Sequence, residues 1–186
     1  MHRWFSLSSV LFSAKAIPEI RKGLSTLAAK PPNPDCTKWI ALGYNDFIHL
    51  SPGKYAPDFI ATDSQGGQIE SKKLRGKIAI LFFWASWCGA CRTDYEDLRL
   101  LQSQYADRLQ IIGVSGDIDR LNYEAALRKE QFPWPNIFDG NDFDGPIAKK
   151  YYLHQYPTII VLDSNGRILS RFARHKPLIE LIKGVM

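Results

Sequence analysis

The sequence predicts an α/β domain in which helices cover both faces of a mixed β-sheet. Three short apolar runs, at residues 78–84, 110–115 and 159–162, have the length of strands. A continuous apolar run suits a strand that is buried on both of its faces. Segments with helical character separate these runs along the chain, and this alternation is typical of a single α/β domain.

The compact domain is expected to span residues 55–186. The prolines at residues 31, 32 and 34 stiffen the chain and stop helix formation, so residues 1–35 are expected to be a leader followed by a linker. Residues 36–54 show no pattern that assigns them. The motif APDF at residues 56–59 begins the domain. The turn-forming residues 64–68 separate two short extended segments, which predicts a β-hairpin ahead of the main sheet.

The first long helix is expected directly after the strand at 78–84. Residues 91–106 are mostly polar, with Leu98, Leu101 and Tyr105 at helical spacing. The residues around Trp134, which lies between two prolines, are expected to break the chain. The other expected helices are, in chain order, 119–131, 145–152 and 177–183, the last with a proline at its start.

The last two strands are expected to flank a tight turn. Residues 159–162 are an apolar run, residues 163–166 carry the turn-forming sequence DSNG, and residues 167–172 form a fourth strand. The chain shows no internal repeat and no low-complexity segment. The 186 residues therefore suffice for one domain with a substantial core.

The net charge of +5 is concentrated before the domain. Residues 1–33 carry five basic side chains against the single acidic Glu19. A nucleic-acid-binding domain would carry its basic excess on its folded surface, so nucleic acid is not an expected partner.

The first 16 residues suggest a targeting segment. A short apolar stretch at 4–14 follows Arg3, and the sequence Ala14-Lys15-Ala16 has the small-x-small form of a signal-peptidase site. This favours export, in a bacterium to the periplasm, with the leader as a possible anchor. The segment also contains serine and arginine and little acid, as mitochondrial presequences do. Mitochondrial import is therefore the alternative.

Cys88 and Cys91 stand between an expected buried strand and an expected helix. Cys88 then lies at the helix N-terminus, where unpaired backbone N–H groups and the helix dipole stabilise a thiolate. Cys91 lies one turn later, within disulfide reach. The spacing predicts that Cys88 attacks a partner disulfide and that Cys91 resolves the resulting mixed disulfide.

Metal and haem sites are not expected. The four histidines show no ligand spacing, and the third cysteine, Cys36, stands alone. Covalent haem attachment needs a histidine directly after the second cysteine, where the chain has Arg92. No cofactor is therefore expected. Cys36 is interpreted as an incidental thiol, with a regulatory or intermolecular disulfide as the alternative.

The stretch FFWASWCGAC resembles the active site of the thioredoxin superfamily. Three further features resemble its TlpA-like or ResA-like branch, and they lie at residues 56–59 with the hairpin that follows, at 74–77 (LRGK) and at 156–168 (YPTIIVLDSNGRI). The resemblance covers roughly residues 55–185. It implies a thioredoxin fold with an N-terminal hairpin, and an enzyme that exchanges a dithiol for a disulfide with protein partners.

The resemblance also implies a substrate-binding surface around the cysteines. Trp87 would shield the pair and contact partners, with Gly89 and Ala90 between the two cysteines. Pro157 would follow a cis peptide bond and face the pair, leaving the backbone of Tyr156 free to bind an extended substrate strand. Trp84 is expected in the core instead.

Two positions depart from thioredoxin itself. The proline between its cysteines is replaced by Ala90, so its strongly reducing potential is not implied. Its buried aspartate, six residues before the first cysteine, is replaced by Phe82. An acid three residues after Cys91, as in ResA-like proteins, makes Asp94 a candidate proton acceptor. The alternative is that Asp94 is a first-turn acid favoured by the helix dipole.

The favoured function is therefore a thiol–disulfide oxidoreductase acting as a reductant, and there are two alternatives. The front end is related to the AhpC/TSA and redoxin group, which suggests a peroxidase, but Leu81 and Ala85 occupy the positions of the peroxide-binding residues. The other alternative is a redox-inactive binding module. The expected partners are the thiols and disulfides of other proteins, among them a membrane electron donor or cytochrome c maturation proteins. The enzyme itself is expected to be a monomer.

Overall fold

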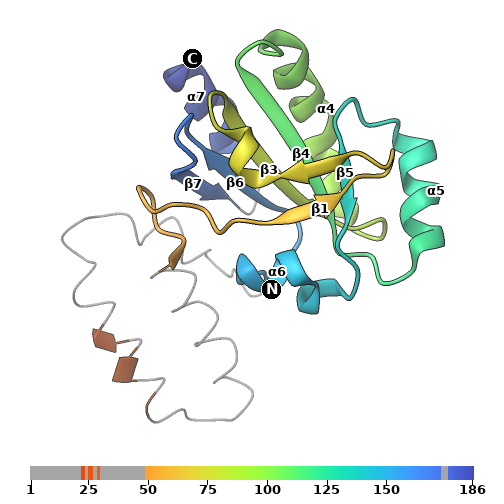
Figure 1. Cartoon of the computed structure of the whole chain (residues 1–186), viewed down its shortest axis with the longest axis horizontal. Coiled ribbons are helices and arrows are strands. Elements are labelled where there is room, and N and C mark those ends of the chain that lie inside the picture. Colours follow the sequence, from red (N-terminus) through yellow and green to blue (C-terminus); the bar gives the residue numbers. More distant parts are fainter. Residues whose placement is uncertain (1–21, 24, 27–28, 30–48, 173–175) are drawn as a thin grey trace, which may run out of the picture. The chain divides into compact units, whose positions relative to one another are not determined.

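The computed structural model describes residues 22–23, 25–26, 29, 49–172 and 176–186. Leu50–Met186 forms one compact unit (Figure 1). The described residues before it are helical. Cys36, the proline linker and most of the expected leader lie outside the described residues.

A five-stranded mixed sheet forms the centre of the unit, in the order β5-β4-β3-β6-β7 (Figure 1). Parallel pairing joins β3 to β4 and β4 to β5, whereas β6 runs antiparallel to both β3 and β7. This mixed sheet with flanking helices confirms the predicted fold class. The strands are β3 (Ile78–Trp84), β4 (Leu109–Ser115), β5 (Asn136–Phe138), β6 (Thr158–Leu162) and β7 (Ile168–Phe172).

The strand β5 is absent from the expectations drawn from the sequence. The prolines beside Trp134 do end the preceding segment, but the chain then pairs at once with β4. The N–H of Gly113 donates to the carbonyl of Pro135 at 2.9 Å, and Asn136 to Phe138 continue this parallel register. Three residues are too few to show strand periodicity, so tertiary pairing alone determines this edge strand.

Alternate side chains of β3 enter two separate hydrophobic clusters. Ala79, Leu81 and Phe83 lie in one cluster, and Ile80, Phe82 and Trp84 lie in the other. Successive side chains of a strand point to opposite faces, so a run that is apolar throughout needs cover on both sides. All six of these side chains are almost completely buried.

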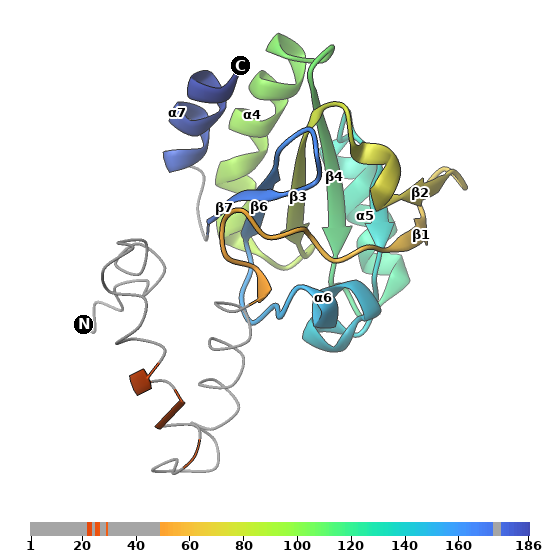
Figure 2. The same cartoon turned by 60° about the vertical axis from the view of Figure 1, so that its left-hand side comes forward.

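Helices and the hairpin supply this cover. The cluster around Trp84 includes side chains from α4 (Gly89–Gln104), α5 (Arg120–Glu130) and α7 (Lys176–Val185), and Figure 2 shows α4 and α7 on the same side of the sheet. The other cluster includes α6 (Pro146–Lys150) and the 3₁₀ turn Ser71–Leu74. The four helices confirm the expected ones, with ends that differ by a few residues.

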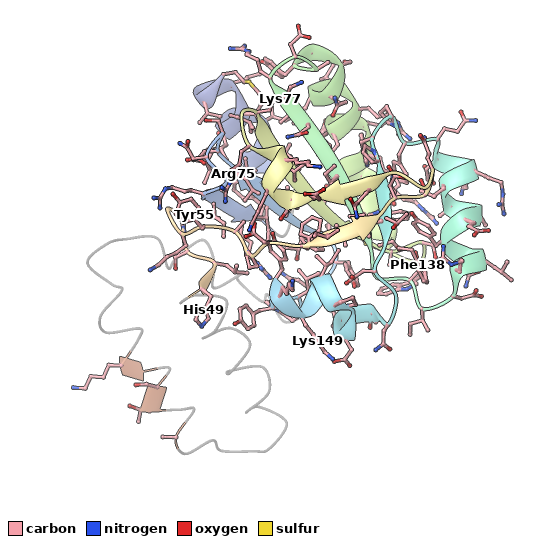
Figure 3. The ribbon with its side chains drawn as sticks, viewed as in Figure 1. His49, Tyr55, Arg75, Lys77, Phe138 and Lys149 are labelled. Atoms are coloured by element: carbon pink, nitrogen blue, oxygen red, sulfur yellow. A yellow bond between two sulfur atoms is a disulfide. The ribbon has the colours of Figure 1, made fainter. Side chains whose placement is uncertain are left out.

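The expected N-terminal hairpin is present as β1 (Ile60–Thr62) and β2 (Gln68–Glu70), paired antiparallel. The segment before it is attached through Tyr55, which forms an isolated antiparallel bridge to Arg167, the residue just before β7. The Arg167 guanidinium lies 4.0 Å from the centre of the Tyr55 ring, and Arg75 approaches the same ring (Figure 3). Exposed cation–π contacts of this kind each contribute about 0.5–1 kcal/mol.

Candidate active site

Cys88 and Cys91 form a disulfide at the first turn of α4. Cys88 is the N-cap residue, and its sulfur accepts a hydrogen bond from the backbone N–H of Cys91 at 3.1 Å. The first N–H groups of a helix have no partner within the helix, and they favour negative charge at this position. The local structure therefore stabilises a thiolate on Cys88 once the disulfide is reduced.

The two cysteines differ in their access to solvent. Cys91 is completely buried, whereas Cys88 keeps 5% of its surface exposed. The residues between them, Gly89 and Ala90, are exposed. Of the two sulfur-bearing residues, Cys88 is therefore the one that a partner can reach from solvent.

A row of aromatic rings lies beside the disulfide. Trp87 is 62% exposed, and its ring meets that of Tyr156 edge-on at 5.6 Å between centroids. Tyr156 in turn stacks on Phe143 at 4.8 Å. Phe143 belongs to the 3₁₀ turn Asp142–Asp144 and was not among the residues singled out in the sequence. The row joins three loops into one apolar surface next to Cys88.

The Tyr156–Pro157 peptide bond is cis, as the resemblance implied. It directly precedes β6, whose first residue, Thr158, is paired with Phe83 near the end of β3. Because β6 runs antiparallel to β3, the chain entering β6 lies at the same edge of the sheet as the chain leaving β3. This topology brings Pro157 to the edge that carries the cysteines.

Asp94 lies on α4, one turn after Cys91, and is 1% exposed. The alternative of a first-turn acid is wrong, because α4 begins at Gly89 and its first turn contains no acid; Asp94 lies beyond that turn and is enclosed. Phe82, at the position of thioredoxin's buried aspartate, is fully buried and packs edge-on against Tyr95. Asp94 is therefore an acid that follows Cys91 by three residues and is buried as Cys91 is.

Asp117, which the sequence analysis did not single out, is also buried, at 1% exposure. It accepts hydrogen bonds from the backbone N–H and the hydroxyl of Ser86, which lies two residues before Cys88. It also accepts one from the hydroxyl of Ser115. Asp117 follows β4, and because β3 and β4 are parallel, the residues after both strands meet at one edge. This strand-end position is the signal that could have identified it.

The phenol of Tyr156 is enclosed by the same loops. Burial, reinforced by the carboxylate of Asp142, raises the pKa of Tyr156 well above its ordinary value. Burial likewise raises the pKa of the Asp142 carboxyl. Gly116 lies directly against the phenol, because a methyl group at Gly116 would approach the Tyr156 hydroxyl to 1.8 Å. Tyr156 is therefore a neutral side chain held in place beside the disulfide.

Two negative findings concern the described residues. No group of three histidine, cysteine, aspartate or glutamate side chains is arranged there to hold a metal ion. No described helix combines the length and hydropathy that a bilayer-crossing segment needs.

The sequence model of the AhpC/TSA family matches residues 52–171. Among curated proteins, the chain is similar to the thiol-disulfide oxidoreductase ResA of Bacillus thuringiensis subsp. konkukian, with 29% identity over 118 residues. The alignment covers 63% of this chain and 66% of that relative, so the chain spans just under two thirds of its length. The thioredoxin-like protein YneN of Bacillus subtilis is also 29% identical, over 65% of this chain and 71% of its own.

Solved structures show the same likeness. A thiol-disulfide oxidoreductase from Bacteroides fragilis superimposes with a TM-score of 0.66 and 29% sequence identity. The superposition covers 72% of this chain and all of the other. The thioredoxin domain of a thiol-disulfide oxidoreductase from Bacteroides vulgatus, 23% identical, has the same fold with a TM-score of 0.67 over 73% of this chain and 98% of its own.

Proposed function

The chain belongs to the AhpC/TSA family and is a ResA-like member of the thioredoxin superfamily, and we propose that it is a thiol–disulfide oxidoreductase acting on proteins. The observation that carries the proposal is the Cys88–Cys91 disulfide at the start of α4, with Cys88 on the accessible side. The pair takes up or releases two electrons without a dissociable cofactor.

In the reducing direction, the Cys88 thiolate attacks one sulfur of a partner disulfide. A bond forms between Cys88 and that sulfur, the partner's disulfide breaks, and the other partner sulfur leaves as a thiolate. Cys91 then loses its proton and attacks Cys88. The second partner thiolate leaves, the Cys88–Cys91 bond re-forms, and the partner has gained two electrons.

Asp94 accepts the proton of Cys91 in this scheme. Cys91 is fully buried, so water has little access to its thiol, and Asp94 is a buried carboxyl one helical turn away. A nearby general base is needed because only the thiolate of Cys91 is nucleophilic.

Partner recognition is assigned to the surface around Cys88. Trp87 offers an exposed apolar face, and Gly89 and Ala90 present little side chain, so a partner backbone can come close to the sulfur. Tyr156 and Pro157 border this surface. An extended partner segment that pairs with the Tyr156 backbone would place its own disulfide beside Cys88.

The physiological role proposed is that of an exported reductant. Its oxidised pair would be re-reduced by a membrane dithiol donor, and its targets would include disulfides formed during cytochrome c maturation. The resemblance to ResA and the apolar stretch before Ala14-Lys15-Ala16 support this assignment. The relatives named above are bacterial proteins and lend no support to the mitochondrial alternative.

A trapping experiment tests the assignment. The Cys91→Ser variant should accumulate mixed disulfides between Cys88 and partner proteins, because the resolving thiol is missing. Tryptic mass spectrometry identifies the linked cysteine, which distinguishes Cys88 from Cys36. The Cys88→Ser variant is the matched control and should trap nothing through the pair. Equal trapping by both variants, or hydrogen peroxide turnover by the unmodified protein, would contradict the proposal.

A further inference from the structure

A buried carboxylate holds the loop that carries the redox pair. Asp117 lies directly beyond β4, and its carboxylate is enclosed by protein. Burying a charge is unfavourable unless hydrogen bonds replace the lost water. Such a group is therefore expected to serve a purpose, and its contacts indicate which.

The contacts of Asp117 converge on Ser86. The backbone N–H of Ser86 lies 3.1 and 3.0 Å from the two carboxylate oxygens, and its hydroxyl lies 2.6 Å from one of them. The hydroxyl of Ser115 donates to the other oxygen at 2.6 Å, and that hydroxyl accepts the N–H of Asp117 itself at 3.1 Å. These contacts all bring a hydrogen-bond donor to the carboxylate, whose two oxygens can accept several such bonds.

The loop held in this way leads directly into the disulfide. Ser86 is separated from Cys88 only by Trp87, and the N–H of Cys88 donates to the carbonyl of Ala85 at 3.0 Å. We propose that Asp117 is a positioning residue that holds this loop through Ser86 and makes the pair more reducing through its negative charge. The inference rests on the proposed function, since it concerns the same cysteine pair.

The electrostatic part follows from the charges of the two redox forms. The disulfide is neutral, whereas the reduced pair carries a thiolate on Cys88. A fixed negative charge nearby disfavours the thiolate and therefore the reduced form. The charge of Asp117 is felt on α4 and at the loop before β6. Burial is the largest cause of the raised pKa of Tyr95 on α4 and of Tyr156 beside Pro157, and the Asp117 carboxylate is one of the smaller causes in both cases.

The test is the equilibrium between the full chain and dithiol buffers of known potential. Asp117→Asn keeps the size of the side chain and can still hydrogen-bond to both serines, because hydroxyl groups both donate and accept. We expect the equilibrium constant to shift about tenfold towards the dithiol, which corresponds to a potential about 30 mV more positive. Alkylation followed by intact-mass measurement gives the reduced fraction, and the pH dependence of alkylation at Cys88 should move to lower pH.

The matched control is Asp119→Asn. It removes the same charge two residues away, from an exposed N-cap position of α5 where asparagine is also favourable. Arg92 and Asp94 on α4 and Asp142 in the neighbouring turn stay unchanged in both variants. Asp117→Ser, which is neutral and smaller, replaces Asp117→Asn if that variant does not fold.

Three outcomes separate the two claims. A shift of the equilibrium towards the dithiol that is clearly larger in the neutral Asp117 variant than in Asp119→Asn supports the inference. A shift no larger than in Asp119→Asn, in a folded variant, overturns the inference and leaves the proposed function intact. Absence of any two-electron couple between the cysteines of the unmodified chain overturns the proposed function itself, and the inference falls with it.

Discussion

Replacing Gly116 by alanine should push Tyr156 away from the disulfide. The added methyl group would lie 1.8 Å from the Tyr156 hydroxyl oxygen and 2.6 Å from the ring carbon that carries it. Non-bonded contacts settle near ~3.5 Å, so the ring has to withdraw by roughly 1.5 Å. Gly116 cannot move away easily, since its N–H donates to Trp84 and its carbonyl accepts from Asp142, both at 3.0 Å.

Two effects are expected from this displacement. Overpacking of this kind costs about 1–3 kcal/mol of folding free energy, which should lower the melting temperature by several degrees. The moved ring also loses its stacking on Phe143 and its contact with Trp87. Reaction of the reduced enzyme with a peptide disulfide should therefore slow several-fold, whereas reaction with the small oxidised glutathione should change little.

Gly184→Ala provides the control, because Gly184 lies in α7 with nothing near its missing side chain. That change should be neutral or stabilise the helix by up to about 1 kcal/mol. Adding Tyr156→Phe to Gly116→Ala removes the closest contact and should restore part of the lost stability. If Gly116→Ala melts like Gly184→Ala and reacts with the peptide at the wild-type rate, the reasoning is refuted.

Two further predictions concern proton transfer and alkaline stability. Asp94→Asn should slow the resolution of a preformed mixed disulfide about 100-fold in rapid-quench measurements, because Cys91 loses its proton acceptor; an unchanged rate would refute the role. Burial raises the pKa of Tyr123 to about 12, from 10.0. A pKa that is higher in the folded state gives stability that is complete below pH 10 and lost as the pH rises through 12. Urea unfolding between these values should therefore show a smaller loss for Tyr123→Phe than for the wild type, and equal losses would contradict the assignment.

The pattern of apolar residues was sufficient to predict most of the sheet. The run at 78–84 is apolar at every position and has the length of a strand that is covered on both faces, which is how β3 lies. β5 could not be predicted, because three residues after a proline show no periodicity. Its backbone hydrogen bonds depend on β4, a segment more than twenty residues earlier.

The candidate site likewise has a part that the sequence predicts and a part that only the structure shows. The spacing of Cys88 and Cys91 between a strand and a helix predicts their disulfide, since both residues belong to one turn of chain. Asp117 contacts Ser86 across 31 residues of chain. Phe143, in a 3₁₀ turn, contacts Tyr156 in the loop before β6. No local pattern marks such contacts, because they exist only once the strand ends and loops have gathered at one edge.

By itself, the sequence determined that this chain folds as an α/β domain with a reactive cysteine pair at a helix N-terminus. Those features depend on neighbours within one turn or one strand, where periodicity and helix-end chemistry act locally. Only the tertiary structure decided what surrounds the pair, namely the buried carboxylates of Asp94 and Asp117 and the aromatic row from Trp87 to Phe143. Burial depends on how separate segments pack together, which no local pattern in the sequence records.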